Sequence, residues 1–526
     1  MTDALATSSS ASLTATRSAS FLGSVGVNTH LSWWDTAWGV GNGQWAGAET
    51  KVVAELQYLN VTNIRDALPS GGAIAEMTDL AKDGYKFDLV QNSANGQVNI
   101  ATDISTLASL QAAAPGAVAS YEGANEYNVN SYTLNGQNSS GNLAWGALDD
   151  QLTQAALKAN TALSGVTYVA ASTASVSAAP SVASYVDASN WHVYGGVGQQ
   201  LKAGLAACIS AAGATASGKP VYVTETGVSS AAVSQSTWGT AGDEYTQGLI
   251  TTNAVLDAFH DGASQTFLYD LMDNNNAADL EDNFGLFNAD GTAKAAATDL
   301  HNLTTILADS GATAKTFATT AMNLTVSNLP TTGSDMLLEK SSGISDLVLW
   351  NSGATVWNTS TNAEATPATS TVAIQLDGIH QTVKVYDPLV SATAVQTYSN
   401  VSSISVGLSK DPLIVELSSG TVSAVPAATK LGTGTHTLIM QMSEDAYNGD
   451  AQFSISVDGT QIGGTQTVVA SHVAGQTQEF DVAGNWTAGT HTVSVNFLND
   501  ACGGTATTDR NLYDNSATFD LSLIHI

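Results

Sequence analysis

Short apolar runs alternate with helical patterns along the first 310 residues. Eight of the runs are predicted strands, at residues 22–27, 61–65, 86–90, 117–122, 166–171, 189–194, 220–225 and 265–270. Between them, apolar side chains recur at the spacing of a helical face, for example at Val52, Leu56 and Leu59. Eight strand–helix units in about 290 residues predict an α/β fold, a (β/α)8 TIM barrel over residues 21–310, rather than an open doubly wound sheet.

Beyond the barrel, the chain changes to alternating strands at short intervals, with turn residues between them. We expect an ancillary β-sandwich over residues 311–420, a Pro-containing linker over 421–430, and a second all-β domain over 431–520 whose loops carry acidic residues. Residues 1–20 are rich in Ser, Thr and Ala and are expected to be disordered.

The two ends of the chain bear on its origin and export. The last six residues, 521–526 (LSLIHI), can be encoded by a transposase end sequence used in DNA library preparation, so they are either a cloning scar or an ordinary last strand. The first twenty residues have neither a basic start nor an apolar core, so no secretory signal peptide is visible. We expect a secreted protein that is exported by another route, such as one with a C-terminal signal.

The composition narrows the partners. The chain has 46 acidic and 15 basic residues and a net charge of -31, although only 12% of its residues are charged. Such a field repels phosphate backbones and anionic lipid, so we expect neither nucleic acid nor membrane as a partner. A surface of neutral polar residues suits a polysaccharide, bound by a monomer. Cys208 and Cys502 lie in different predicted domains, so no disulfide is expected between them.

Two carboxylates at strand ends are the most informative feature for function. Asn125 and Glu126 follow the fourth predicted strand, and Glu225 ends the seventh. An unpaired charge costs several kcal/mol, in order of magnitude, to bury, so such strands make little sense as packing alone. In a (β/α)8 barrel the strand ends converge on the active site, so the sequence predicts a catalytic pair.

Other polar residues end the apolar runs and are predicted to join this site: Asn28, His30, Arg65, His192, Tyr194, Tyr269 and Asp270. His30 fits a core histidine as well as a substrate contact. Glu122 points the same way as Glu126 along its strand and is expected to be paired inside the barrel. Trp33, Trp34 and Trp38 follow the first strand and can stack on sugars or anchor their loop.

The chemistry of such a pair is known in general terms. Retaining hydrolysis of a glycosidic bond needs a carboxylate nucleophile and a carboxylic acid roughly 5 to 5.5 Å apart. Arg65 beside Glu225 would keep that group ionised, whereas Glu126, flanked by Asn125, would be kept protonated.

The order of these residues resembles clan A of the retaining glycoside hydrolases, the 4/7 barrels, from residue 21 to about residue 309. The resemblance implies that Glu126 is the acid/base, Glu225 the nucleophile and Asn125 a ligand of the sugar 2-hydroxyl. It also implies that Tyr194 and Arg65 orient the nucleophile. Tyr269 and Asp270 stand where many members have a tryptophan that supports the sugar.

The last domain resembles the calcium-dependent xylan-binding carbohydrate modules, through EDAYNGDAQFSISVDG and FLNDACGGTATTDRNLYD. The resemblance implies a Ca²⁺ held by loops, with four candidate ligands, Asp445, Asp450, Asp500 and Asp509. Solvated acidic turns without metal are the alternative.

Together these features predict a secreted retaining glycoside hydrolase that cleaves internal β-glycosidic bonds of a polysaccharide, either xylan-like or a β-glucan or exopolysaccharide. No cofactor is expected for catalysis, and Ca²⁺ is expected in the binding module. The alternative is a non-catalytic, surface-located protein that binds polysaccharide or mediates adhesion.

Overall fold

The computed structural model describes residues 9–33, 49–174, 180–232, 236, 238–274, 279–418, 427–473, 475–504, 509–520 and 522–524. The chain divides into two compact units. The first holds the barrel and the sheet that follows it, up to Leu417, and the second holds the outer part of the β20–β21 hairpin and the residues from Ser418 on.

Eight parallel strands form the barrel, in the spatial order β11-β8-β5-β4-β3-β14-β13-β12. A parallel bridge between Val169 and Ala188 joins the two end strands and closes the ring. The strands are β3 Val25–Asn28, β4 Asn63–Ala67, β5 Lys86–Val90, β8 Val118–Glu122, β11 Thr167–Val169, β12 Ser189–Val193, β13 Val221–Thr226 and β14 Ala263–Leu268. The predicted barrel is confirmed, with each strand inside or within two residues of its predicted run.

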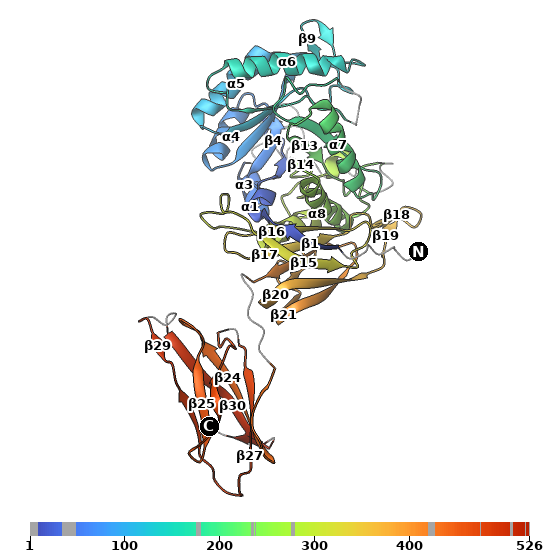
Figure 1. Ribbon diagram of the computed structural model, residues 1–526. Helices are drawn as coiled ribbons and strands as arrows, with labels where there is room; N and C mark the ends of the chain where they lie inside the picture. Colours follow the sequence, from blue (N-terminus) through green and yellow to red (C-terminus); the bar gives the residue numbers. More distant parts are fainter. Residues whose placement is uncertain are drawn as a thin grey trace. The chain divides into compact units, whose positions relative to one another are not determined.

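Helices connect the strands, as Figure 1 shows. They are α1 Ser18–Leu22, α3 Glu49–Leu59, α4 Ala73–Lys82, α5 Ile100–Ala113, α6 Ala144–Ala159, α7 Lys202–Thr215, α8 Glu244–His260 and α9 Ala295–Ile306, with the short helices η1 Leu31–Trp33 and η3 Glu281–Asn283. Two short hairpins in the loops pair to form a small four-stranded sheet. Its strands are β6 Ser93–Ala94, β7 Gln97–Val98, β9 Thr133–Leu134 and β10 Gln137–Asn138.

An all-β region follows the barrel, as the sequence predicts. Its strands are β15 Ala321–Ser327, β16 Ser334–Glu339, β17 Ser345–Trp350, β20 Ser370–Tyr386, β21 Gln396–Leu408 and β22 Leu413–Leu417, with the small hairpin β18 Trp357–Asn358 and β19 Ala363–Glu364. Pairing joins the longer strands in one sheet of order β1-β15-β20-β22-β17-β16-β2, with β21 on β20.

The N-terminal segment belongs to this sheet, so the prediction of disorder over residues 1–20 is wrong for its described part. β1 Ser9–Thr14 pairs antiparallel with β15, and β2 Thr16–Arg17 pairs parallel with β16. The Ser-, Thr- and Ala-rich composition suggested disorder. The pairing could not be foreseen, because the partner strands are far away in the sequence. Only Ala15 separates β1 from β2, which are the two end strands of the sheet, so the sheet curls round on itself.

The barrel and this sheet share a hydrophobic core. Leu338, Val348 and Trp350 of the sheet belong to the same buried cluster as the barrel strands. Trp350 Nε1 donates to Asp257 Oδ1 of α8 at 2.7 Å. α8 is buried over thirteen consecutive residues, Thr246 to Ala258, because it has neighbours on both sides.

The C-terminal module is a sandwich of two sheets with its own core, including Phe453 and Phe480. One sheet has the order β23-β27-β24-β30-β29 with β31 on β30, and the other has the order β26-β25-β28. The strands are β23 Thr429–Gly432, β24 His436–Asp445, β25 Gln452–Val457, β26 Thr460–Thr467, β27 Gln478–Gly484, β28 Val493–Phe497, β29 Ala501–Cys502, β30 Asp509–Phe519 and β31 Ser522–Ile524.

Two further predictions can be compared with the fold. Cys208 is buried and Cys502 is exposed, and both are free thiols, as predicted. Of the helices that the structure describes, none has the length and apolar character that a membrane crossing requires.

Candidate active site

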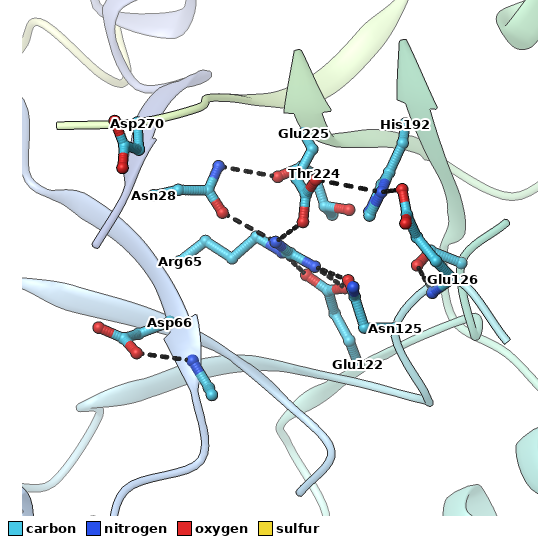
Figure 2. Close-up of polar contacts among 12 residues, drawn as sticks. Asn28, Arg65, Asp66, Glu122, Asn125, Glu126, His192, Thr224, Glu225 and Asp270 are labelled. Carbon is cyan, nitrogen blue, oxygen red and sulfur yellow. Dashed lines mark hydrogen bonds and ion pairs between the residues drawn. The ribbon is translucent and has the colours of Figure 1, made fainter. Parts of the chain in front are cut away.

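Arg65 of β4 lies at the centre of the polar residues at the strand ends (Figure 2). Its side chain is buried, and its Nε donates to Glu122 Oε1 at 2.6 Å. Its Nη1 donates to Glu225 Oε1 at 2.6 Å and to Asn28 Oδ1 at 2.8 Å. Its Nη2 donates to Asn125 Oδ1 at 2.9 Å. One guanidinium therefore fixes side chains that come from three other strands.

Glu225 is the fifth residue of β13, and its carboxylate has three partners. Besides Arg65, the Tyr194 hydroxyl donates to Oε2 at 2.9 Å, and His192 Nδ1 lies 3.3 Å from the same oxygen. Burial alone would raise the pKa of Glu225, but His192, Arg65 and Tyr194 outweigh it and hold this pKa below its ordinary value. A carboxyl in this setting is ionised at neutral pH.

Glu126 approaches the site from the loop after β8. Its φ is 45°, in the left-handed region that residues other than glycine rarely adopt, and its amide donates to Ser172 Oγ at 2.8 Å. His192 Nδ1 lies 2.8 Å from Glu126 Oε1, while His192 Nε2 is buried without a partner among the described residues. Nδ1 therefore carries the proton, because it alone has an acceptor.

The two glutamates meet in one place. A carboxylate oxygen of Glu126, a carboxylate oxygen of Glu225 and a ring nitrogen of His192 all lie within 4.8 Å of one another. Such a trio can in principle hold a divalent cation. Here the Arg65 guanidinium already supplies a positive charge to Glu225 at 2.6 Å, which disfavours a second cation beside it.

A cavity of about 750 Å³ contains both glutamates. It is lined by His30, Asn125, Glu126, Ala174, Tyr194, Gly195, Glu225, Trp238, Tyr269, Glu281 and Phe284. A second cavity of about 250 Å³ shares His30, Asn125, Glu225 and Tyr269 with the first and adds, among others, Asn28 and Arg65. The carboxylate pair therefore lies where two hollows meet.

The structure brings together all the barrel residues that the sequence predicts for the site. Each lines one of the two cavities or, like His192, contacts a glutamate, except for Asp270, which is buried beside His30. His30 lines both cavities, and its Nε2 lies 3.5 Å from Asp270 Oδ2. Glu122 is fully buried and paired with Arg65, as expected. Of the tryptophans after the first strand, Trp34, Trp38 and the side chain of Trp33 lie outside the described residues.

Sequence reasoning missed five lining residues of the larger cavity, and three of them have large side chains: Trp238, Glu281 and Phe284. Trp238 is 46% exposed, and its ring lies edge-on to Tyr194 at 6.1 Å. It offers an aromatic face in the cavity. Glu281 begins the short helix η3, the other two lie outside helices and longer strands, and no strand pattern marks any of them.

In the C-terminal module, the four predicted calcium ligands do not converge on one point in the structure. Asp445 Oδ2 accepts from the Tyr513 hydroxyl at 2.6 Å, and Asp445 Oδ1 is buried without a partner among the described residues. In the part of the chain that the structure describes, no three of Asp445, Asp450, Asp500 and Asp509 bring their oxygens within 4.8 Å. The ligand set stays a prediction.

Glu444, near the end of β24, is an additional acidic group beside these residues that the sequence prediction left out. Its side chain is buried, and burial raises its pKa to about 7, with nearby Asp450 adding to the rise. Arg510 fixes the loop between β24 and β25. Its Nε donates to the Gly449 carbonyl at 2.9 Å and its Nη2 to the Asn448 carbonyl at 2.6 Å. Crowded carboxylates and unpaired carboxylate oxygen suit Ca²⁺, which prefers oxygen ligands.

Three comparisons place these observations among known proteins. Residues 437–520 match the family described as calcium-dependent, xylan-binding carbohydrate-binding modules. No curated protein sequence matches this chain.

Several solved structures are similar in fold. One is a family 39 glycoside hydrolase from the gut symbiont Bacteroides cellulosilyticus WH2, with 13% identity over 75% of this chain and 80% of that chain and a TM-score of 0.47. Another is an endo-β-1,6-glucanase, with 10% identity over 80% of this chain and 96% of that chain and a TM-score of 0.44. An endo-laminarinase from Formosa has 15% identity over 51% and 84%, respectively, and a TM-score of 0.37.

At these identities and TM-scores, the likeness to solved structures carries no conclusion about activity. The match to a family is different in kind, because it covers the whole C-terminal sandwich except its first strand and last residues. Residues 437–520 belong to the calcium-dependent, xylan-binding carbohydrate-binding modules, as the sequence resemblance predicts.

Proposed function

We propose that the protein is a retaining glycoside hydrolase that cleaves internal β-glycosidic bonds of a polysaccharide by double displacement. The observation that carries the proposal is the approach of Glu126 and Glu225 oxygens to within 4.8 Å in a shared cavity. A retaining pair stands roughly 5 to 5.5 Å apart, whereas an inverting pair stands roughly 6.5 to 9.5 Å apart to admit a water molecule.

In the first step, Glu225 is the nucleophile. Its ionised carboxylate attacks the anomeric carbon and forms a glycosyl ester, while protonated Glu126 donates its proton to the departing glycosidic oxygen. Arg65 and Tyr194 hold one oxygen of Glu225 each, so the attacking group is oriented before the substrate arrives. His192 donates to one oxygen of Glu126 and leaves the other to carry the proton.

In the second step, Glu126 acts as a base. It removes a proton from a water molecule whose oxygen attacks the anomeric carbon, and the bond to Glu225 breaks. Glu225 leaves as a carboxylate, which Arg65 stabilises at 2.6 Å, and Glu126 is protonated again for the next cycle. The sugar keeps its anomeric configuration because it is inverted twice.

The substrate is inferred from the cavities and the module. Two hollows that meet at Glu225 give room for sugars on more than one side of the cleaved bond, which supports internal cleavage. The xylan-binding module supports a neutral β-linked polysaccharide, either xylan-like or a β-glucan or exopolysaccharide. Such a substrate is found outside cells, so we place the protein there.

Glu225→Gln and Glu126→Gln test the proposal on a polysaccharide panel. Reducing-sugar release by Glu225→Gln should fall by about 10³-fold or more, and release by Glu126→Gln by about 10²- to 10⁴-fold. The matched control is Glu76→Gln, on the outer helix α4, which should keep wild-type activity. Nuclear magnetic resonance of the first product should show retained configuration, and inverted product would refute the mechanism.

Chemical rescue assigns the two roles separately. In Glu126→Ala, azide can enter the vacated space and attack the glycosyl ester, giving a glycosyl azide of retained configuration. In Glu225→Ala, azide replaces the nucleophile and gives the inverted glycosyl azide. Calcium-dependent binding of polysaccharide with no sugar released by the wild type would instead favour the adhesion protein.

A further inference from the structure

Glu281 brings a third carboxylate to the cavity of Glu126 and Glu225. It begins the short helix η3 in the loop after β14, and its side chain is exposed to the cavity. Among the described residues, no cation or hydrogen-bond donor contacts this carboxylate. Burial and then the charge of Glu225 raise the pKa of Glu281, so the acids already repel one another.

The loop that carries Glu281 is held firmly. The Leu280 carbonyl accepts from Ser229 Oγ at 2.8 Å, and the Asn283 carbonyl accepts from the Ser230 amide at 2.9 Å. Lys294, which is buried, donates to the same Asn283 carbonyl at 3.4 Å. The carboxylate therefore has a defined place in the cavity wall.

No lysine or arginine of the described part of the chain lines the larger cavity. Within residues 21–310 the chain has eight basic residues: Lys51, Arg65, Lys82, Lys86, Lys158, Lys202, Lys219 and Lys294. None of them is among the described lining residues, and the undescribed stretches of the barrel contain neither lysine nor arginine in their sequence.

The two buried cations near the site are already committed. Arg65 gives its donors to Glu122, Glu225, Asn28 and Asn125, and Lys294 Nζ donates to Asp273 Oδ1 at 2.6 Å. Recognition of a sugar carboxylate needs a free arginine or lysine, or a set of uncommitted donors. An acidic sugar in this cavity would lose its water and face carboxylates instead.

We propose that Glu281 is a specificity-determining residue that makes the larger cavity reject acidic sugars, so that the sugar bound there is neutral or carries a free amine. The inference rests on the proposed function, because it deepens the substrate class of the same site. It goes beyond that function, since the two-carboxylate mechanism alone does not set the charge of the sugar.

The test compares two matched substrates. One is a uronic-acid-bearing xylan or glucan oligosaccharide, and the other is the same oligosaccharide after reduction of its carboxyl groups to alcohols. The measured quantity is the ratio of kcat/KM for the reduced substrate to that for the acidic one. Wild type should favour the reduced substrate by roughly tenfold or more, as expected for like charges near a protein surface.

Glu281→Gln should lower this ratio by roughly tenfold, and Glu281→Lys should invert it, whereas Glu281→Asp should keep it. Added salt should weaken the preference of wild type but leave that of Glu281→Gln nearly unchanged, which a purely structural role would not produce. Asp79→Asn on the outer helix α4 makes the same change in net charge and should leave the ratio as in wild type.

An equal ratio in wild type and Glu281→Gln overturns the inference while the proposed function stands. If wild type cleaves neither substrate, the proposed function fails, and the same pair is compared by equilibrium binding to the wild-type protein. Chelator silences the calcium-dependent module in that measurement. Equal binding of the acidic and reduced oligosaccharides would then overturn the inference, and weaker binding of the acidic one would uphold it.

Discussion

At the scale of single residues, the two glutamates differ in how completely they are held. Glu225 has Arg65, Tyr194 and His192 around it, and these contacts together keep its pKa low against the effect of burial. Glu126 shares only His192 with it and sits on a loop with a positive φ. A nucleophile must be ionised and fixed, whereas an acid/base has to gain and lose a proton in each cycle.

Tyr194→Phe should move the acidic limb of activity to higher pH. Loss of one hydrogen bond raises the pKa of Glu225, so a larger fraction of this group is protonated and inactive at low pH. We expect kcat/KM to fall by about tenfold near pH 5 and by less near pH 7. The measurement is the pH profile of kcat/KM.

Tyr168→Phe is the matched control for this change. The Tyr168 hydroxyl also donates to a carboxylate, Asp150 Oδ1 at 3.1 Å, but neither residue lines the cavity of the two glutamates. This variant should keep the wild-type pH profile, even if it is less stable. The same displacement in both variants would contradict the role given to Tyr194.

The residues that could be predicted are those attached to strands. Arg65, Glu225 and His192 lie inside barrel strands, so a strand prediction also places their side chains at the same end of the barrel. Trp238 and Glu281 lie in loops, whose paths depend on contacts that no local pattern records. Their place in the cavity could therefore be seen only in the structure.

At the scale of elements, α8 links the barrel to the ancillary sheet. The buried Trp350 of β17 donates its Nε1 hydrogen to Asp257 of α8, whose other oxygen has no partner among the described residues. Burial raises the pKa of Asp257. The hydrogen bond from Trp350 therefore joins β17 of the ancillary sheet to α8 of the barrel.

Trp350→Phe should destabilise the first unit as a whole. The change leaves a small cavity and removes the indole N–H that donates to Asp257 Oδ1, so we expect the free energy of unfolding to fall by roughly 3 kcal/mol. Urea denaturation followed by circular dichroism measures it. Trp357→Phe is the control, since Trp357 Nε1 has no partner among the described residues. An equal loss in the two variants would contradict the importance of the hydrogen bond.

Pattern predicts strands well where the partners are neighbours in the sequence. The eight barrel strands are short apolar runs, and barrel strands that follow one another along the chain lie side by side. The sequence predicts all of them. β1 and β2 have no such signal, because SSASLT lacks a clear alternation and pairs with β15 far along the chain. Their order comes from the partner strand.

At the scale of the whole molecule, buried acids set the response to pH. Burial raises the pKa of Glu55 to about 8, of Asp299 to about 8 and of Asp103 to about 7. In the unfolded chain these groups ionise near pH 4. Between about pH 4 and about pH 8 the unfolded state therefore releases protons that the folded state keeps, and stability falls as pH rises.

The melting temperature of the first unit should accordingly be higher at pH 4.5 than at pH 8. Glu55→Gln removes one such group without changing its shape, so the loss of stability over this window should be smaller in that variant. Scanning calorimetry at a series of pH values measures both. A melting temperature that rises from pH 4.5 to pH 8 would contradict the prediction.

Calcium removal should affect the second unit alone. Chelator should abolish retention on insoluble xylan and lower the melting temperature of the module, because carboxylates such as Glu444 and Asp450 would lose a shared cation. Hydrolysis of short soluble oligosaccharides should continue at the wild-type rate. Asp450→Asn should reproduce the effect of chelator on binding, and loss of hydrolysis on chelation would contradict a metal-free catalytic site.

The position of β1 and β2, the two end strands of the ancillary sheet, has a consequence for folding during synthesis. Arg17 Nε donates to the carbonyl of Phe317, 300 residues further on. β1 likewise pairs with β15, which is synthesised much later. During synthesis the ribosome releases the early segment long before its partners exist. Contacts over such long stretches form slowly, so the barrel is expected to assemble first, with these residues exposed to proteases and chaperones until the sheet closes around them.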